Sequence, residues 1–154
     1  MTAAVAAAAL AAAALNAAAA ALGGWLWYVG EPSLSGARAF WILLRIGQGS
    51  ALTLALAVGS LAAAGNYSRD DLFYLYALLP LAVAFIGEQL RVAAAQTVLD
   101  QRGLPGAQAV GRLPEAEQRE LVAHIVRREI GVTATSALVV AFLALRAAST
   151  AHGF

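Results

Sequence analysis

Residues 72–102 read LFYLYALLPLAVAFIGEQLRVAAAQTVLDQR, and they are the one stretch that joins a long apolar run to opposed charges, Glu88 and Arg91. A helix needs about 20 mostly apolar residues to cross a bilayer. Counting that length from Leu72 puts the far membrane interface near Arg91, with Glu88 about one turn inside it. Because ionisable groups at such a depth pair with other groups, the stretch predicts a membrane-spanning helix with a polar contact to a neighbouring helix.

The whole chain shares this apolar character. Of its 154 residues 61% are hydrophobic, and its mean hydropathy of +0.72 is far above that of soluble proteins. We therefore expect a single integral membrane domain over residues 1–154. The net charge of +1 argues against nucleic acid as a partner. The lack of cysteine excludes disulfides and thiolate metal sites within the chain.

Four apolar segments predict an all-α fold, a four-helix transmembrane bundle with spans at about 3–29, 39–64, 71–95 and 130–148. Residues 98–129 are expected to form a cytoplasmic segment between the third and fourth spans. This segment contains a loop rich in glycine and proline, followed by an amphipathic helix that opens at Pro114. The amphipathic helix either lies along the membrane surface or continues directly into the fourth span.

Small side chains recur about every four residues in three of the spans, which predicts close packing between helices. Asn16 lies on the first of these stripes and is expected to make an interhelical hydrogen bond worth ~0.6 kcal/mol. The stripes are Ala8, Ala12, Asn16, Ala20 and Gly24; Gly47, Ala51, Ala55, Gly59 and Ala63; and Glu129, Thr133, Ala137, Ala141, Ala144 and Ala148.

Arginine is distributed unevenly between the two sets of loops. Because positive residues in short loops favour the cytoplasm, the bias predicts that both termini lie outside it. The loops after the first and third spans hold Arg38, Arg102, Arg112, Arg119, Arg127 and Arg128, whereas Arg69 and Arg146 lie on the opposite side. All basic residues are arginine, and alanine, glycine, leucine and valine dominate, which is typical of a high-GC bacterium and places the protein in the bacterial cytoplasmic membrane.

Arg45 and Glu88 are expected to form an ion pair, because both lie at the same depth. Arg45 is four residues inside Trp41, and Glu88 is three residues inside Arg91. At 1.5 Å per residue, each is ~5 to 6 Å below the cytoplasmic interface. The pair is either a structural clasp or part of a ligand or proton site. The expected cluster comprises Arg45, Gln48, Glu88, Arg91, Glu129 and Thr133.

No catalytic residue, metal site or cofactor is predicted. The two histidines, His124 and His152, lie outside the spans, so no intramembrane pair of imidazoles is available to ligate haem. Glu120 and His124 are neighbours on one helix face, but two ligands are fewer than a zinc or iron site uses. A solvated helix face is therefore the favoured interpretation of this pair.

The motif EQLR at residues 88–91 and the motif RREIGV at residues 127–132, within a four-span chain of this length, resemble small uncharacterised integral membrane proteins of high-GC bacteria. The resemblance covers most of the chain. It implies the four-span architecture, and it implies no activity, substrate or site residue.

These observations predict a non-enzymatic multi-pass membrane protein that self-associates or serves as an accessory subunit of a larger membrane complex. Its expected partners are the lipid bilayer and either further copies of itself or other membrane subunits. The alternative is a small transporter, channel or lipophilic-ligand binder that uses the polar cluster, because ionisable residues inside a membrane are functional candidates.

Overall fold

The computed structural model describes residues 2–30 and 33–151, and His152 lies outside this part of the chain. The described residues form helices joined by short turns and contain no strand, as the all-α prediction requires. The helices are α1 (Thr2–Val29), α2 (Leu34–Ala63), α3 (Asp71–Gln101), α4 (Ala107–Val110) and α5 (Glu115–Thr150).

Four of these helices, α1, α2, α3 and α5, are long and apolar enough to cross a membrane, which confirms the four predicted spans as helices. Helix α2 begins at Leu34, before the expected start near residue 39, and α3 continues to Gln101. The side chain of Asp70 caps α3 by accepting a hydrogen bond of 3.0 Å from the Leu72 amide. Gly103, with a φ of +66°, ends the same helix, as glycine commonly does.

The amphipathic segment after Pro114 is not a separate helix. Residues 115–129 contain no glycine or proline that would interrupt the chain, and they form the first turns of α5. Leu121 is buried against Val98 and Leu99 at the end of α3, and Ile125 packs on the same cluster. The apolar face of the segment therefore covers α3, which selects direct continuation into the fourth span over a helix lying on a surface.

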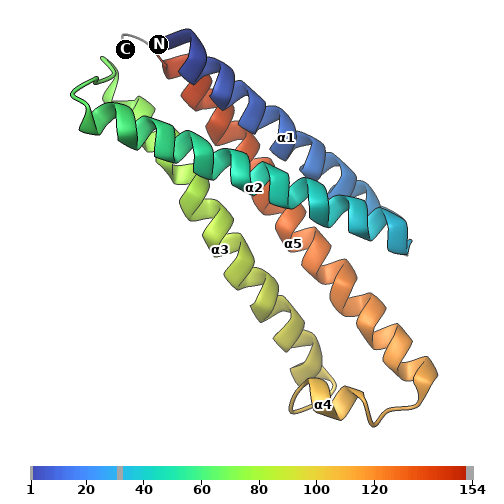
Figure 1. Cartoon of the computed structure of the whole chain (residues 1–154). Helices are drawn as coiled ribbons and strands as arrows, with labels where there is room; N and C mark the ends of the chain where they lie inside the picture. Colours follow the sequence, from blue (N-terminus) through green and yellow to red (C-terminus); the bar gives the residue numbers. More distant parts are fainter. Residues whose placement is uncertain (1, 31–32, 152–154) are drawn as a thin grey trace.

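Helix α5 is the centre of the arrangement (Figure 1), because it packs along both α1 and α3. Helix α2 packs mainly on α1 and crosses obliquely toward α3, with little contact to α5. The beginning of α1 and the end of α5 lie at one end of the molecule, and α4 joins α3 to α5 at the other (Figure 1).

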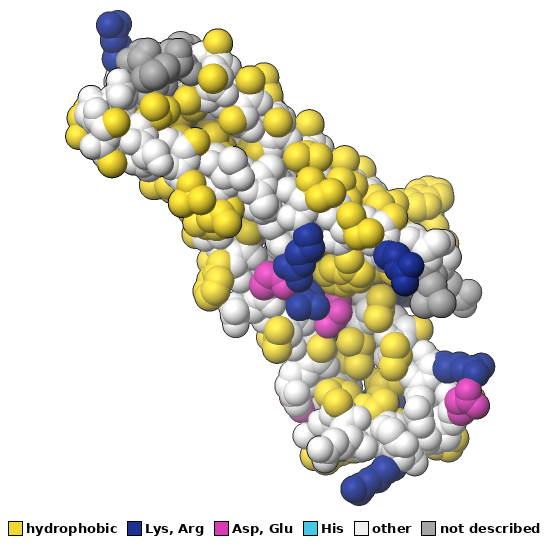
Figure 2. Space-filling view, in the orientation of Figure 1, with side chains coloured by type: hydrophobic (Ala, Val, Ile, Leu, Met, Phe, Trp, Pro, Cys, Tyr) yellow, Lys and Arg dark blue, Asp and Glu magenta, His cyan; other side chains and the backbone are white. Residues whose placement is uncertain are grey.

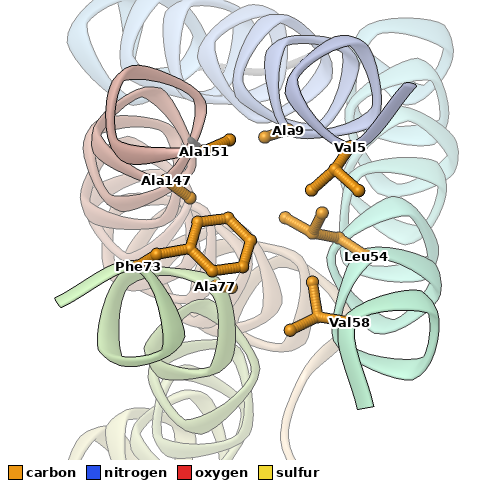
Figure 3. Close-up of a cluster of buried hydrophobic side chains, with 8 residues drawn as sticks. All are labelled: Val5, Ala9, Leu54, Val58, Phe73, Ala77, Ala147 and Ala151. Atoms are coloured by element: carbon orange, nitrogen blue, oxygen red, sulfur yellow. The ribbon is translucent and has the colours of Figure 1, made fainter. Parts of the chain in front are cut away.

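The core between the helices is built mostly from small and branched side chains. At the end near the start of α1, Phe73 fills the space left by alanines of α1, α3 and α5 (Figure 3). Alanine at these positions lets the helix backbones approach closely. The cluster comprises Val5, Ala9, Leu54, Val58, Phe73, Ala77, Ala147 and Ala151.

The bundle uses most of the predicted small-residue stripes internally. Ala12 and Asn16 of α1 are buried, as are Ala51 of α2 and Ala137 of α5. Only the end of the α2 stripe, Gly59 and Ala63, is exposed. The stripes therefore explain how this chain folds, and they leave little of their own surface for a second protein.

Candidate functional site

Side chains from three helices meet in one polar cluster. Arg45 and Gln48 come from α2, Glu88 and Arg91 from α3, and Glu129 from α5. Figure 2 shows acidic and basic side chains gathered near the middle of one face, with hydrophobic side chains around them. The structure thus brings together five of the six residues that the sequence assigned to the cluster.

Glu88 is the centre of the cluster because both of its carboxylate oxygens accept hydrogen bonds. Its Oε1 accepts from Arg45 Nη1 at 2.9 Å and from Gln48 Nε2 at 2.9 Å. Its Oε2 accepts from Arg91 Nε at 3.1 Å and from Arg45 Nη2 at 3.3 Å. Arg45 also donates to Gln48 Oε1 at 2.6 Å, which orients the amide toward Glu88. One carboxylate therefore ties α2 to α3 through two-point contact with a guanidinium, the strong form of such a bond.

Arg91 extends the network to α5 and to an aromatic ring. Its Nη1 lies 3.8 Å from Glu129 Oε2. Its Cζ lies 5.4 Å from the centroid of the Trp41 ring, which is within the range of a cation–π contact. Trp41 was expected only as an interface anchor, and its second role is detectable in the sequence only through the similar depth assigned to Trp41 and Arg91.

Thr133 does not join the network. Its hydroxyl is buried and donates to the backbone carbonyls of Glu129, at 2.8 Å, and Ile130, at 3.3 Å, in its own helix. Sequence spacing put Thr133 one turn from Glu129, but spacing cannot tell whether a threonine hydroxyl bonds to its own backbone or to another helix.

The cluster is balanced in charge and its hydrogen bonds are made. Two arginines face two carboxylates, and among residues 2–30 and 33–151 no buried side-chain nitrogen or oxygen lacks a partner. The side chain of Arg45 is 53% exposed, whereas Glu88 and Glu129 are 23% and 18% exposed. This geometry suits a clasp between helices, with one side open through Arg45.

Glu120 and His124, the two neighbouring residues of α5 that resemble metal ligands, do not form a metal site. Glu120 pairs with Arg102 at 2.9 Å, between α5 and the end of α3, and His124 is exposed. The described part of the chain contains no group of three histidine, aspartate or glutamate side chains placed to hold a metal ion.

Comparison with models of known protein families, with curated proteins and with solved structures finds no match. The fold and the site themselves define the structural class: an all-helical chain with four helices able to cross a membrane, two of which are tied together by a polar cluster.

Proposed function

We propose that this chain is a non-enzymatic, multi-pass protein of a bacterial cytoplasmic membrane that works by self-association or as an accessory subunit of a larger membrane complex. The observation that carries this proposal is the outer face of α1. Ala7, Ala11 and Ala18 are exposed there, on the side of α1 away from its contacts with α2 and α5.

Alanine is a poor lipid-facing residue and a good helix-facing one. It is only weakly hydrophobic, whereas a spacing of four residues between small side chains lets two helices approach closely. The exposed surfaces of α3 and α5 carry Leu75, Phe85 and Phe142 instead, which suit lipid. The contrast favours α1 as the helix that meets another protein.

The polar cluster supports the non-enzymatic part of the proposal. Its carboxylates and guanidiniums are engaged with one another, and the cluster holds no serine or cysteine nucleophile and no histidine. A catalytic acid or base must reach the proton that it transfers. Here each candidate group already faces a partner within the protein.

The orientation proposed for the chain has both termini outside the cytoplasm. It is supported by the arginine bias between the loops, which places the α3–α5 connection and the start of α5 on the cytoplasmic side. The resemblance to four-span membrane proteins of high-GC bacteria supports the same location.

The second candidate function is that of a small transporter, channel or lipophilic-ligand binder. The exposure of Arg45 favours it, because a ligand with an acidic group would find that guanidinium accessible. A stoichiometric, non-lipid small molecule that copurifies with the protein, and that Arg45→Gln releases, would establish this function.

Crosslinking in native membranes followed by mass spectrometry tests the first proposal. We expect crosslinked peptides that join two copies of the chain, or that join the chain to a fixed set of membrane proteins. A monomer with no reproducible neighbour would contradict it.

A further inference from the structure

The face between α1 and α5 carries a long groove that is apolar along most of its length and polar at one end. Its apolar part, of about 590 Å³, is lined by small and branched side chains that include Ala17, Ala21, Gly24 and Leu138. A second hollow, of about 530 Å³, continues from it and is lined by His124, Glu120 and Arg127. Trp27 and Arg128 line both hollows, so the two form one continuous surface.

Arg128 stands at the junction of the apolar and polar parts and has no ionic partner among residues 2–30 and 33–151. No hydrogen bond or ion pair joins it to another residue of the described chain, although it is partly buried. Its neighbour Arg127 donates to the Trp27 carbonyl at 3.1 Å. Glu120, the carboxylate of the polar hollow, is already paired with Arg102. Among the described residues, therefore, no carboxylate neutralises the charge of Arg128 at the mouth of the groove.

The dimensions and chemistry of the groove match one lipid molecule. From Arg128 to Leu138 the apolar part runs about 15 Å along α5 at 1.5 Å per residue, which is half of a bilayer core of ~30 Å. Trp27 packs against Gly131 beside the junction, and tryptophan marks the level where headgroups meet acyl chains. A phospholipid with one acyl chain in the groove would thus bring its headgroup phosphate to Arg128.

We propose that the α1–α5 groove binds an anionic phospholipid, with an acyl chain between Ala17 and Leu138 and its headgroup phosphate on Arg128 and Arg127. This inference rests on the membrane location proposed above. An apolar helix of a second protein is a poorer occupant, because it would leave the charge of Arg128 without a counter-ion. The groove also lies apart from the outer alanine face of α1, since Ala7, Ala11 and Ala18 do not line it.

Native mass spectrometry of the full chain in mild detergent tests this proposal, with added phosphatidylglycerol or with phosphatidylcholine of the same acyl chains. The wild type is expected to bind one phosphatidylglycerol in preference to phosphatidylcholine. Arg128→Ala is expected to weaken phosphatidylglycerol binding about fivefold, the effect of losing one arginine contact with an anionic surface. Arg112→Ala removes an exposed loop arginine outside the groove and is expected to bind as the wild type does.

Gly24→Leu tests the acyl chain separately from the headgroup. A Cβ at Gly24 meets no atom within 4 Å, so the added side chain starts in open space on the lining of the groove. It is expected to weaken both lipids, whereas Gly59→Leu, at an equally open position on α2, is expected to weaken neither. If the site bound free phosphate and no acyl chain, Gly24→Leu would leave binding unchanged.

Three results would overturn the proposal: equal binding of the two lipids by the wild type, full phosphatidylglycerol binding by Arg128→Ala, or unchanged lipid binding by Gly24→Leu. If Gly24→Leu instead converts a dimer to a monomer with lipid binding intact, the groove holds a second copy of the chain. Crosslinking from the outer face of α1 reports self-association independently of lipid binding, because neither Arg128 nor Gly24 lies on that face. Loss of lipid binding with crosslinking intact, and loss of crosslinking with lipid binding intact, are therefore distinguishable.

Discussion

The side-chain amide of Asn16 in α1 donates a hydrogen bond of 3.0 Å to the backbone carbonyl of Gly47 in α2. The same nitrogen bonds to the Ala12 carbonyl at 2.9 Å, which fixes the orientation of the amide. Asn16 is 1% exposed, so neither bond competes with solvent. The contact is possible because Gly47 has no side chain, and it holds the two helices at close range.

Gly47→Ala is therefore expected to destabilise the protein by about 1 to 3 kcal/mol, the usual cost of overpacking a core. A Cβ at Gly47 would lie 2.9 Å from Asn16 Oδ1, and the two hydrogen bonds of Asn16 prevent it from moving away. Thermal unfolding in mild detergent measures the effect.

Gly49→Ala is the matched control, because Gly49 lies in the same helix and a Cβ there meets nothing within 4 Å. It is expected to leave stability unchanged or raise it by up to about 1 kcal/mol through helix propensity. Equal unfolding temperatures for the two variants would show that the Asn16–Gly47 contact is not tight.

A double-mutant cycle tests the clasp between Arg45 and Glu88. Arg45→Gln and Glu88→Gln each leave a charge without its main partner, so each is expected to lower stability. The double variant is expected to lose about 1 kcal/mol less than the sum of the single losses, as residues in one network do. Additive losses, or single variants as stable as the wild type, would show that the pair is not a clasp.

Neutral substitutions are preferable to exchanging the two charges. Arg91 Nε lies 3.1 Å from Glu88 Oε2, so an arginine at position 88 would face another arginine. If a charge-reversed pair did not restore stability, the cause could be either the absence of an Arg45–Glu88 clasp or the repulsion between Arg91 and the new arginine. Glutamine keeps a donor and an acceptor at both positions and leaves the contact between Arg91 and Glu129 in place.

Sequence reasoning predicted the helices and the levels of their charged residues, because apolar length and depth along a helix depend only on residue count. It also placed Ala12 and Asn16 on a packed stripe of α1, and both are buried, with Asn16 making the expected interhelical hydrogen bond. Residues 3–21 are otherwise nearly all alanine, so the sequence does not tell which further alanines of α1 are buried: Ala19 is buried and Ala18 is exposed. Sequence reasoning also left open whether the segment after Pro114 continues into the fourth span. The packing of Leu121 on α3 accompanies that continuation, and residue periodicity does not reveal such a tertiary contact.

The arginine bias predicts the topology of the chain in its membrane. A periplasm-active reporter fused after Phe154, which lies outside the described residues, is expected to be active. The same reporter within residues 103–112 is expected to be inactive, because that loop is short enough to follow the positive-inside rule. A fusion at Asn66, which the same bias puts on the side of the C-terminus, is also expected to be active. The reverse pattern would contradict the orientation.

The most direct measurement of the central claim, association through α1, is photocrosslinking from single cysteines in native membranes. The chain has no cysteine, so a thiol-reactive photocrosslinker is confined to one chosen position. Ala18→Cys places it on the outer face of α1, and Phe85→Cys places it on the exposed face of α3, where Phe85 is 65% exposed. We predict a protein adduct of defined mass from position 18 and none from position 85. Lipid adducts alone from both positions would contradict the account.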